Sequence, residues 1–206
     1  MIKKYLITGV NLLLLISCQK ELVSDMASVS PQQAVTQIPQ QNPTVFTKYT
    51  IASGQQYADK NIFTQTSYAE LKFIAKFDSS AIYSNSDPNN QYDINKLYGF
   101  SDNNSTHHQF SARFGWRWSD NALRLFGYIY NNGLRSSKEL GTVAIGAENN
   151  CSIKITPSHY VFSLNNLKDS LPRTSATSKA EGYKLYPYFG GDESAPHDIF
   201  IYIKEL

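Results

Sequence analysis

The chain has 206 residues and a formal net charge of +2 at pH 7, and its lysines and arginines are dispersed. This length allows one domain with a sizeable core, and the charge argues against nucleic acid as a partner. Tyrosine (14 residues) and phenylalanine (11 residues) are abundant, which favours sheet over helix. The chain has no phosphate-binding loop, zinc-protease motif or serine-hydrolase elbow, so we predict no cofactor and no metal site.

The chain begins like an exported protein. A short basic start precedes a mostly apolar run, Tyr5–Ile16, which is shorter than the about 20 residues needed to span a membrane. Leu15-Ile16-Ser17-Cys18 closes this run and resembles the lipobox of bacterial lipoproteins. The resemblance implies a signal peptide over residues 1–17 and lipid attachment to Cys18. An ordinary secretory leader with a chance cysteine is the alternative.

The resemblance also predicts where the protein resides. Gln19 follows the cysteine, where an aspartate would retain some bacterial lipoproteins at the inner membrane. The analogy therefore favours the outer membrane of the cell envelope, with the membrane as a partner reached through lipidated Cys18.

A tether and one domain follow the leader. Residues 18–43 are rich in Gln, Ser, Thr and Pro and show no apolar period, which predicts a flexible, lipidated tether. We expect a single folded domain over residues 44–206. Its lone cysteine, Cys151, has no partner for an internal disulfide, and we expect it to be a small buried side chain.

The domain is predicted to consist of short strands joined by polar turns. The expected strands are Val45–Ile51, Tyr68–Phe77, Gln109–Trp118, Ala122–Tyr130, Leu140–Ala147, Cys151–Thr156, His159–Leu164, Glu181–Phe189 and Asp198–Lys204. Asn131-Asn132-Gly133 carries the hairpin signal Asn-Gly. Many short strands without a helical period indicate an all-β, antiparallel β-sandwich, and the long loops suit the jelly-roll type.

One strand face is the best candidate for a binding site. Apolar residues alternate along Gln109–Trp118 and Ala122–Tyr130, so the intervening residues point away from the core. If the two strands pair, that outward face carries six candidate glycan-binding residues: Arg113, Arg117, Arg124, Phe126, Tyr128 and Tyr130. Aromatic rings stack on sugars, and arginines bind carboxylates or sulfates bidentately. In the alternative interpretation, the aromatics lie under another sheet and the arginines reach solvent at its rim.

A polar loop is the second candidate. It follows Gly190-Gly191 and contains Asp192, Glu193, His197 and Asp198. Such groups can bind a cation or supply an acid and a base. The spacing matches no metal motif, and we favour a structural connection in which the carboxylates accept backbone hydrogen bonds.

Two further polar segments are interpreted as loops. His107 and His108 are adjacent at a strand start, so they point to opposite faces and chelate poorly. The segment from Asp87 to Asn95 alternates acids and amides but has Tyr92 where an EF-hand needs glycine and Tyr98 where it needs glutamate. A calcium site of another type stays a minor option there.

The domain resembles small bacterial lipoproteins of no assigned activity. The likeness rests on Phe77-Asp78-Ser79-Ser80-Ala81, Arg113-Phe114-Gly115-Trp116, Tyr188-Phe189-Gly190-Gly191-Asp192-Glu193 and Ala195-Pro196-His197-Asp198. At the level of fold the chain is similar to the concanavalin-like jelly rolls, which include lectins, glucanases and alginate lyases. The Gln-Ile-His and Tyr-Phe-Lys-Ala-Gly motifs of alginate lyases and the paired acids of glucanases are missing. Neither activity is therefore carried over.

Three functions stay open at this point. The preferred one is an envelope lipoprotein whose sandwich binds a polysaccharide without catalysis, and the arginines would suit an anionic polymer. The second is a polysaccharide lyase or glycoside hydrolase with His197 or a tyrosine such as Tyr128 as base. The third is a structural or partner-binding envelope protein.

Overall fold

The computed structural model describes residues 45–206. The predicted leader over residues 1–17, the lipidation site Cys18 and the tether over residues 18–43 lie outside the described residues. Within the described part, no helix is both long enough and apolar enough to cross a membrane.

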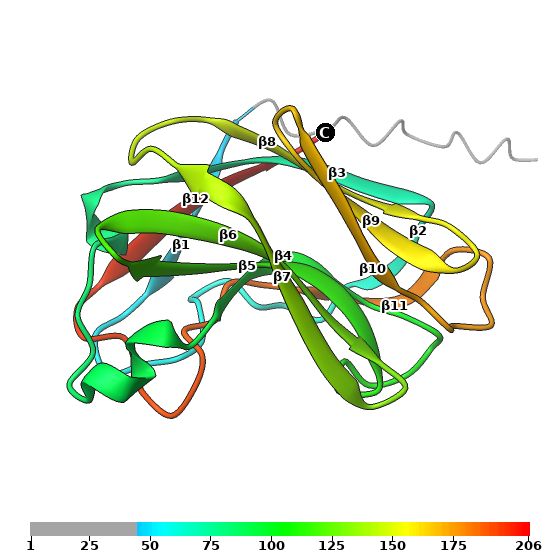
Figure 1. The fold of residues 1–206 in the computed structure, drawn as a ribbon, viewed down its shortest axis with the longest axis horizontal. Helices are drawn as coiled ribbons and strands as arrows, with labels where there is room; N and C mark the ends of the chain where they lie inside the picture. The colour runs from blue at the N-terminus through cyan, green and yellow to red at the C-terminus, as the bar shows by residue number, and fades with distance from the viewer. Residues whose placement is uncertain (1–44) are drawn as a thin grey trace, which may run out of the picture. The chain divides into compact units, whose positions relative to one another are not determined.

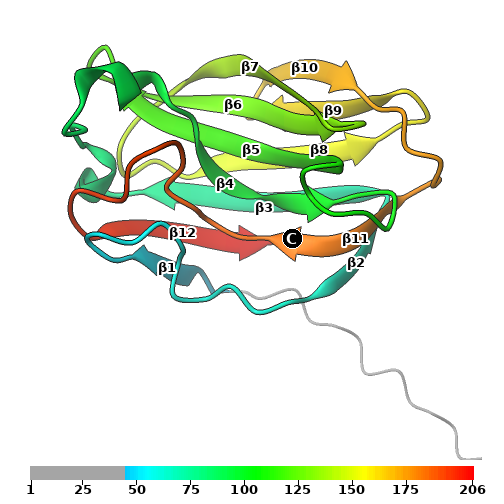
Figure 2. The same cartoon turned by 90° about the horizontal axis from the view of Figure 1, so that it is seen from below.

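Two antiparallel sheets of six strands each form the domain, and their strands run alongside one another in Figures 1 and 2. In spatial order the β3 sheet contains β1 (Thr47–Ile51), β12 (Ile199–Glu205), β3 (Glu70–Phe77), β8 (Asn149–Ile155), β9 (His159–Leu164) and β10 (Leu167–Pro172). The β5 sheet contains β2 (Gln65–Tyr68), β11 (Ala180–Leu185), β4 (Asn95–Ser101), β5 (Phe110–Ser119), β6 (Ala122–Asn131) and β7 (Leu134–Val143). Two short 3₁₀ helices, η1 (Ser79–Ala81) and η2 (Pro88–Tyr92), lie between β3 and β4. The predicted antiparallel β-sandwich of jelly-roll type is confirmed.

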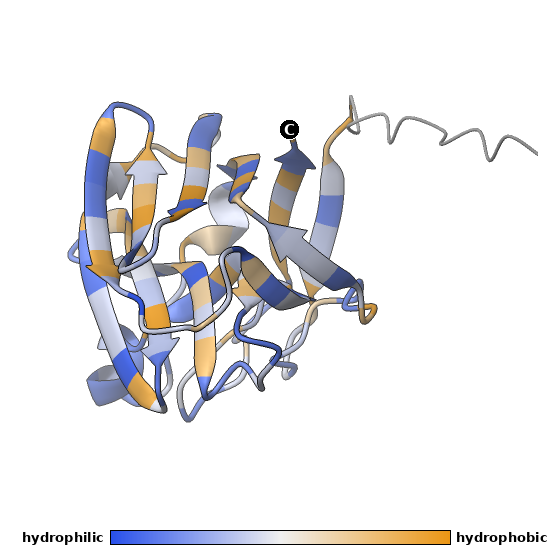
Figure 3. Ribbon diagram, turned by 90° about the vertical axis from the view of Figure 1, so that its right-hand side faces the viewer, coloured by the Kyte–Doolittle hydropathy of each residue, from blue (hydrophilic) through white to orange (hydrophobic). Residues whose placement is uncertain are grey.

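The core lies between the two sheets and is rich in aromatic rings. Figure 3 shows polar and apolar residues alternating along the strands, as a sheet with one buried face requires. Phe73 of β3 meets Phe114 of β5 edge-on at 5.5 Å between ring centroids, and Phe77 lies 5.4 Å from Trp116. All four side chains are almost fully buried. Each contributes about 1.5–3 kcal/mol of transfer free energy, so these strands are held firmly in place.

The hairpin predicted at Asn132-Gly133 connects β6 to β7. Both residues have positive φ, 53° and 78°, as a type I′ turn requires. β7 is an edge strand of the β5 sheet, and its Lys138 pairs with Asp169 of β10 at 2.7 Å. This ion pair links the neighbouring edges of the two sheets.

Four strands differ from the sequence prediction. β2, β4 and β10 were not predicted, and β7 spans Leu134–Val143, where a strand was expected at Leu140–Ala147. β7 and β10 are edge strands with many exposed residues, so they lack the apolar alternation on which the prediction depended. β4 contains a bulge between Lys96 and Tyr98, which shifts its alternation by one residue.

Candidate functional site

The candidate site is the face of the β5 sheet opposite the core. β5 and β6 pair in register, with Arg113 opposite Tyr128 and Arg117 opposite Arg124. Phe126 and Tyr128 are only 4 % exposed, yet both lie outside the core cluster between the sheets. We call this surface the Arg113 face. It carries the six predicted residues Arg113, Arg117, Arg124, Phe126, Tyr128 and Tyr130, together with Lys96 of β4 and Tyr183 of β11.

Arg113 is a buried cation without a counter-ion. Its side chain belongs to a residue that is 7 % exposed, and its Nε has no hydrogen-bond partner within residues 45–206. No ion pair in the described part of the chain includes it. Burial lowers the pKa of Arg113, and the groups that oppose this shift are the tyrosines Tyr128, Tyr130, Tyr183 and Tyr188. An unpaired buried charge is costly, because the guanidinium has lost water without gaining a carboxylate partner.

The backbone beside Arg113 leaves no room for a larger residue. Gly99 of β4 lies opposite Arg113, and a Cβ on Gly99 would come within 2.4 Å of the Arg113 Cβ and 2.2 Å of the Ala112 carbonyl oxygen. Tyr128 lies on the other side, with its ring 5.6 Å from the guanidinium carbon. Arg113 therefore lies between the glycine backbone of β4 and the aromatic ring of Tyr128.

Lys96 is a second cation on the same face. Its Nζ lies 5.1 Å from the centre of the Tyr128 ring. Burial, helped by the charge of Arg113, lowers the pKa of Lys96 to about 8, although Asp93 opposes the shift. Gly190 makes room for Lys96, because a Cβ there would lie 2.3 Å from Nζ. Lys96 thus loses its charge only slightly above neutral pH.

His107 and Tyr183 border Arg113 on another side. The Tyr183 hydroxyl lies 2.9 Å from His107 Nδ1 and also accepts a hydrogen bond from the His107 backbone N–H. Burial, with the charges of Arg113 and His108, lowers the pKa of His107 to about 4. The imidazole is therefore neutral at pH 7. The histidine pair lies in a turn, as predicted, but the two rings do not point to opposite faces, because their centroids are 4.1 Å apart. His107 also contacts Tyr183 of the site.

Tyr128 and Tyr130 present two hydroxyl-bearing rings beside Arg113. Their ring centroids are 6.0 Å apart. Burial and the neighbouring Tyr130 raise the pKa of Tyr128 to about 12, against the opposing charges of Arg113 and Arg135. Tyr128 is therefore protonated at neutral pH and can donate a hydrogen bond or a proton.

Arg117 and Arg124 differ from Arg113 because protein groups already occupy them. Arg117 donates to the Tyr92 carbonyl at 2.8 Å and to Ser119 Oγ at 3.1 Å, and its guanidinium lies 4.8 Å from the Phe126 ring centre. Arg124 pairs with Glu139 at 2.9 Å and with Asp120 at 3.2 Å. These two arginines hold neighbouring loops and strands in place. Of the three predicted arginines, only Arg113 has neither an ion pair nor a partner for its Nε within residues 45–206.

The predicted polar loop does not form a cluster. Glu193 accepts hydrogen bonds from the backbone N–H groups of Ser86 and Asp87, and Asp198 accepts one from Ser53. His197 Nε2 lies 2.9 Å from the Ser80 carbonyl oxygen, and Asp192 is exposed. Each bonded side chain thus serves a different segment, and none of these hydrogen bonds involves a residue of the Arg113 face. Within residues 45–206, no three His, Cys, Asp or Glu side chains are grouped to hold a metal ion.

The segment considered for calcium has a structural role. Asp87 caps η2, its carboxylate accepting from the Asn89 backbone N–H at 2.9 Å. Arg117 binds the last residue of η2, Tyr92, through its carbonyl. The acids and amides of this segment therefore shape a turn at one end of the face.

A hollow of about 420 Å³ adjoins the site on the side of β2 and β11. It is lined by Phe63, Gln65, Asn104, Ser105, Thr106, Gly182 and Tyr183. Tyr183 belongs both to this hollow and to the surroundings of Arg113. Tyr183 is therefore the residue that the hollow shares with the Arg113 face.

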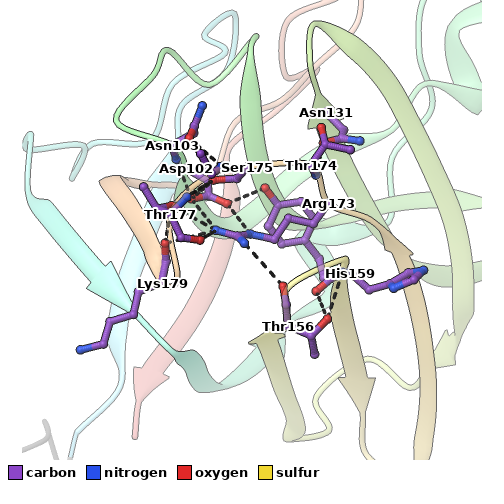
Figure 4. A network of polar contacts seen from close by, with 12 residues as sticks. Asp102, Asn103, Asn131, Thr156, His159, Arg173, Thr174, Ser175, Thr177 and Lys179 are labelled. Atoms are coloured by element: carbon purple, nitrogen blue, oxygen red, sulfur yellow. Dashed lines mark hydrogen bonds and ion pairs between the residues drawn. The ribbon is translucent and has the colours of Figure 1, made fainter.

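A buried ion pair holds the loop beside the hollow (Figure 4). Arg173 Nε donates to Asp102 Oδ2 at 2.8 Å, and the two residues are 2 % and 0 % exposed. Tyr160, Ser175 and Thr177 also donate to the Asp102 carboxylate. This carboxylate lies at the end of β4, so the network fixes the start of the loop that leads to His107.

Comparisons with known proteins concern the fold. No protein-family model matches the chain, and no curated protein matches its sequence. An alginate lyase from Chlorella virus shares 12% identity over 78% of this chain and 82% of its own, with a TM-score of 0.46. A glycoside hydrolase family 16 endo-glucanase from Bacteroides ovatus shares 12% identity over 78% and 80%, with a TM-score of 0.48. The carbohydrate-binding module CBM66 from Bacillus subtilis shares 10% identity over 76% and 93%, with a TM-score of 0.36. Likeness at this level carries no conclusion about the activity of this chain.

Proposed function

We propose that the Arg113 face binds a polysaccharide that carries uronate carboxylates. The observation that carries this proposal is the buried guanidinium of Arg113, which has no carboxylate partner among residues 45–206. A ligand carboxylate would supply the missing charge through a charge-assisted hydrogen bond. Nearby Lys96 strengthens the preference for an anion while it is protonated.

The surroundings of Arg113 suit a sugar rather than a bare inorganic anion. Tyr130 and Tyr183, which are partly exposed, offer rings and hydroxyl groups near Arg113, while the buried Tyr128 ring lies against the guanidinium. Aromatic rings cover the apolar face of a pyranose, and hydroxyl groups bond to its polar edge. These two features together favour a ring that carries both hydroxyls and a carboxylate.

A binding assay with matched ligands tests the proposal. Wild type should bind uronate oligosaccharides, and it should bind them much more weakly after their carboxylates are chemically reduced to alcohols. Arg113→Met should abolish the difference between the two ligands. Lys154→Met is the control, because it removes one positive charge from an exposed position on the other sheet. Equal binding of both ligands by wild type would refute a carboxylate site.

Elimination at the bound uronate is a second candidate function, favoured by Lys96 and the tyrosine pair. In this reaction a base removes the proton at C5, the C4–O4 bond breaks, and its electrons leave with the O4 oxygen, which takes up a proton. The electrons of the C5–H bond form the new C4=C5 double bond. Arg113 would neutralise the carboxylate and so acidify C5, while Lys96 in its neutral form accepts the proton. Tyr128, protonated at neutral pH, or Tyr130 would donate to the leaving oxygen.

The pH dependence separates binding from elimination. The pKa of Lys96 near 8 predicts that anion binding weakens as pH rises through that value. Elimination with neutral Lys96 as base would instead become faster over the same range. Ultraviolet absorbance of the new double bond follows the reaction, and Lys96→Gln should remove it while binding persists. If an oligosaccharide binds but no absorbance develops at any pH, the elimination reaction is refuted and only the binding function stands.

We also propose that the domain is anchored to the cell envelope through lipidated Cys18, with residues 18–43 as a tether and the outer membrane as the site. The support comes from the Leu15-Ile16-Ser17-Cys18 pattern alone. Cys18→Ser should leave an uncleaved precursor without incorporated fatty acid. Acylation that persists in this variant would overturn the anchor.

A further inference from the structure

We infer that the hollow beside Tyr183 is a second sugar subsite that takes an uncharged, hydroxyl-bearing unit of the polymer. This inference rests on the proposed binding of a uronate at Arg113 and adds the chemistry of the neighbouring unit. It assigns the ligand to polysaccharides in which a uronate is linked to a neutral sugar, rather than to polymers of uronate alone.

The lining of the hollow has the composition that a neutral sugar needs. Phe63 is 74 % exposed, and its ring lies 5.5 Å from that of Tyr183 at an interplanar angle of 34°. Two aromatic rings thus border a hollow whose other side chains carry amides and hydroxyls, from Gln65, Asn104 and the neighbouring Ser and Thr residues. None of the lining residues is charged. A carboxylate placed here would lose water without gaining a counter-ion, whereas a hydroxyl group loses little.

The glycine in the lining allows β11 to lie close to β4. A Cβ on Gly182 would lie 2.3 Å from the Ser101 Oγ, so a larger residue would force β11 away from β4. Ser101 Oγ accepts a hydrogen bond from the backbone N–H of Tyr183 at 2.9 Å. This close approach fixes Tyr183 at the border between the two subsites.

The loop on the other side of the hollow is fixed before any ligand binds. Asn103 and Asn104 both have positive φ, 58° and 50°, a conformation that few residues adopt. The ion pair between Asp102 and Arg173 holds the start of this loop, and the Asn104 backbone N–H donates to the Glu181 carbonyl at 2.7 Å. The polar groups lining the hollow are therefore pre-organised, which lowers the entropic cost of binding.

The two subsites are close enough for one polymer. Tyr183 is on β11 and Arg113 is on β5, with only β4 between these strands. Neighbouring strands are about 4.8 Å apart, so the backbones are separated by roughly 10 Å. The Tyr183 hydroxyl also contacts His107, which borders Arg113. A chain that places a carboxylate on Arg113 thus reaches the hollow with an adjacent unit.

The test compares two hexasaccharides, one that alternates glucuronate with a neutral hexose and one made of glucuronate alone. Phe63→Ala should weaken binding of the alternating hexasaccharide by about fivefold, through loss of an aromatic contact. It should leave the affinity for the uniform one unchanged. Ile62→Ala is the matched control, because Ile62 is the adjacent residue, is 77 % exposed and does not line the hollow. Both positions are exposed, so both variants should fold.

The outcomes separate this inference from the proposed function. If Arg113→Met weakens binding of both hexasaccharides while Phe63→Ala changes neither, the subsite is refuted and the uronate site stands. If Phe63→Ala weakens both equally, the hollow binds sugar without the preference for a neutral unit, and the assigned ligand class is wrong. If wild type binds neither hexasaccharide, both proposals fail.

Discussion

Arg113 and Arg173 are the two arginines buried in the described part of this sandwich, and they differ in what surrounds them. Arg173 pairs with Asp102 at 2.8 Å, its Nη2 also donates to the carbonyl oxygens of Thr177 and Lys179, and its Nη1 donates to the Thr156 carbonyl. Arg113 has aromatic rings and cations around it and an Nε without a partner. Both are shielded from water, but only one is neutralised.

This difference distinguishes structure from function. A buried ion pair with every polar atom bonded specifies the position of the segments it joins. A buried cation that the protein leaves unpaired reduces stability, and such a group persists in a fold when a ligand completes it. Judged only by their low solvent exposure, Arg113 and Arg173 would look alike. The missing counter-ion is the reason for proposing Arg113 as the binding group.

The largest expected effect on stability comes from breaking the ion pair between Asp102 and Arg173. Asp102→Asn removes the charge that neutralises Arg173 and should lower the free energy of unfolding by about 3–5 kcal/mol, measured by denaturant titration. The double variant Asp102→Leu/Arg173→Met removes both charges and should recover part of that loss. A single variant as stable as wild type would show that water or other groups compensate Arg173.

Replacing Arg113 should not lower the free energy of unfolding as replacing Asp102 does. Arg113→Met removes an uncompensated buried charge, so the free energy of unfolding should stay unchanged or rise by about 1 kcal/mol. Binding of uronate oligosaccharide should weaken by about 1.5–3 kcal/mol, the range for a charge-assisted hydrogen bond. Calorimetric titration and thermal unfolding of the same samples measure both quantities. Loss of stability together with loss of binding would make Arg113 a structural residue like Arg173.

Lys96 provides a pH-dependent form of the same comparison. Its pKa falls from 10.5 to about 8 on folding, so between these values the unfolded chain binds more protons and stability should rise with pH. The slope for one such group is at most about 1.4 kcal/mol per pH unit. Below pH 8 Lys96 is protonated in the folded protein as well as in the unfolded chain, so the stability gained at higher pH is absent. Between pH 8 and pH 10 the free energy of unfolding should rise more steeply with pH in wild type than in Lys96→Met. Equal slopes in the two proteins would contradict the lowered pKa of Lys96.

The sequence predicted the strands that bury one complete face. β3, β5 and β6 alternate because every second residue contacts the other sheet, and this periodicity also placed Arg113 and Tyr128 on one outward face. The bulge at Lys96 interrupts the same signal, so this cation was missed. The role of His107 was missed because its partner, Tyr183, is 76 residues away in the sequence.

The state of each arginine could not be predicted, for a related reason. Arg113, Arg117 and Arg124 have the same spacing signal, but Glu139 and the Tyr92 carbonyl reach two of them from other segments. Alternation reports which way a side chain points, and it carries no information about what meets it there. Partner groups from distant segments decide which arginine is free.

Arg117 allows the most demanding test of this distinction, because it lies on the same face as Arg113 and differs in its partners. Its hydrogen bonds to the Tyr92 carbonyl and Ser119 Oγ already use donors that a ligand would need. Arg117→Met should therefore lower the free energy of unfolding by about 1 kcal/mol, through loss of these hydrogen bonds. Affinity for uronate oligosaccharides should fall by less than about threefold, since only screened, long-range attraction is removed. The same titrations as for Arg113→Met measure both effects. If Arg117→Met weakens binding as much as Arg113→Met, the whole cationic face attracts the polymer, and an unpaired guanidinium is no guide to the site.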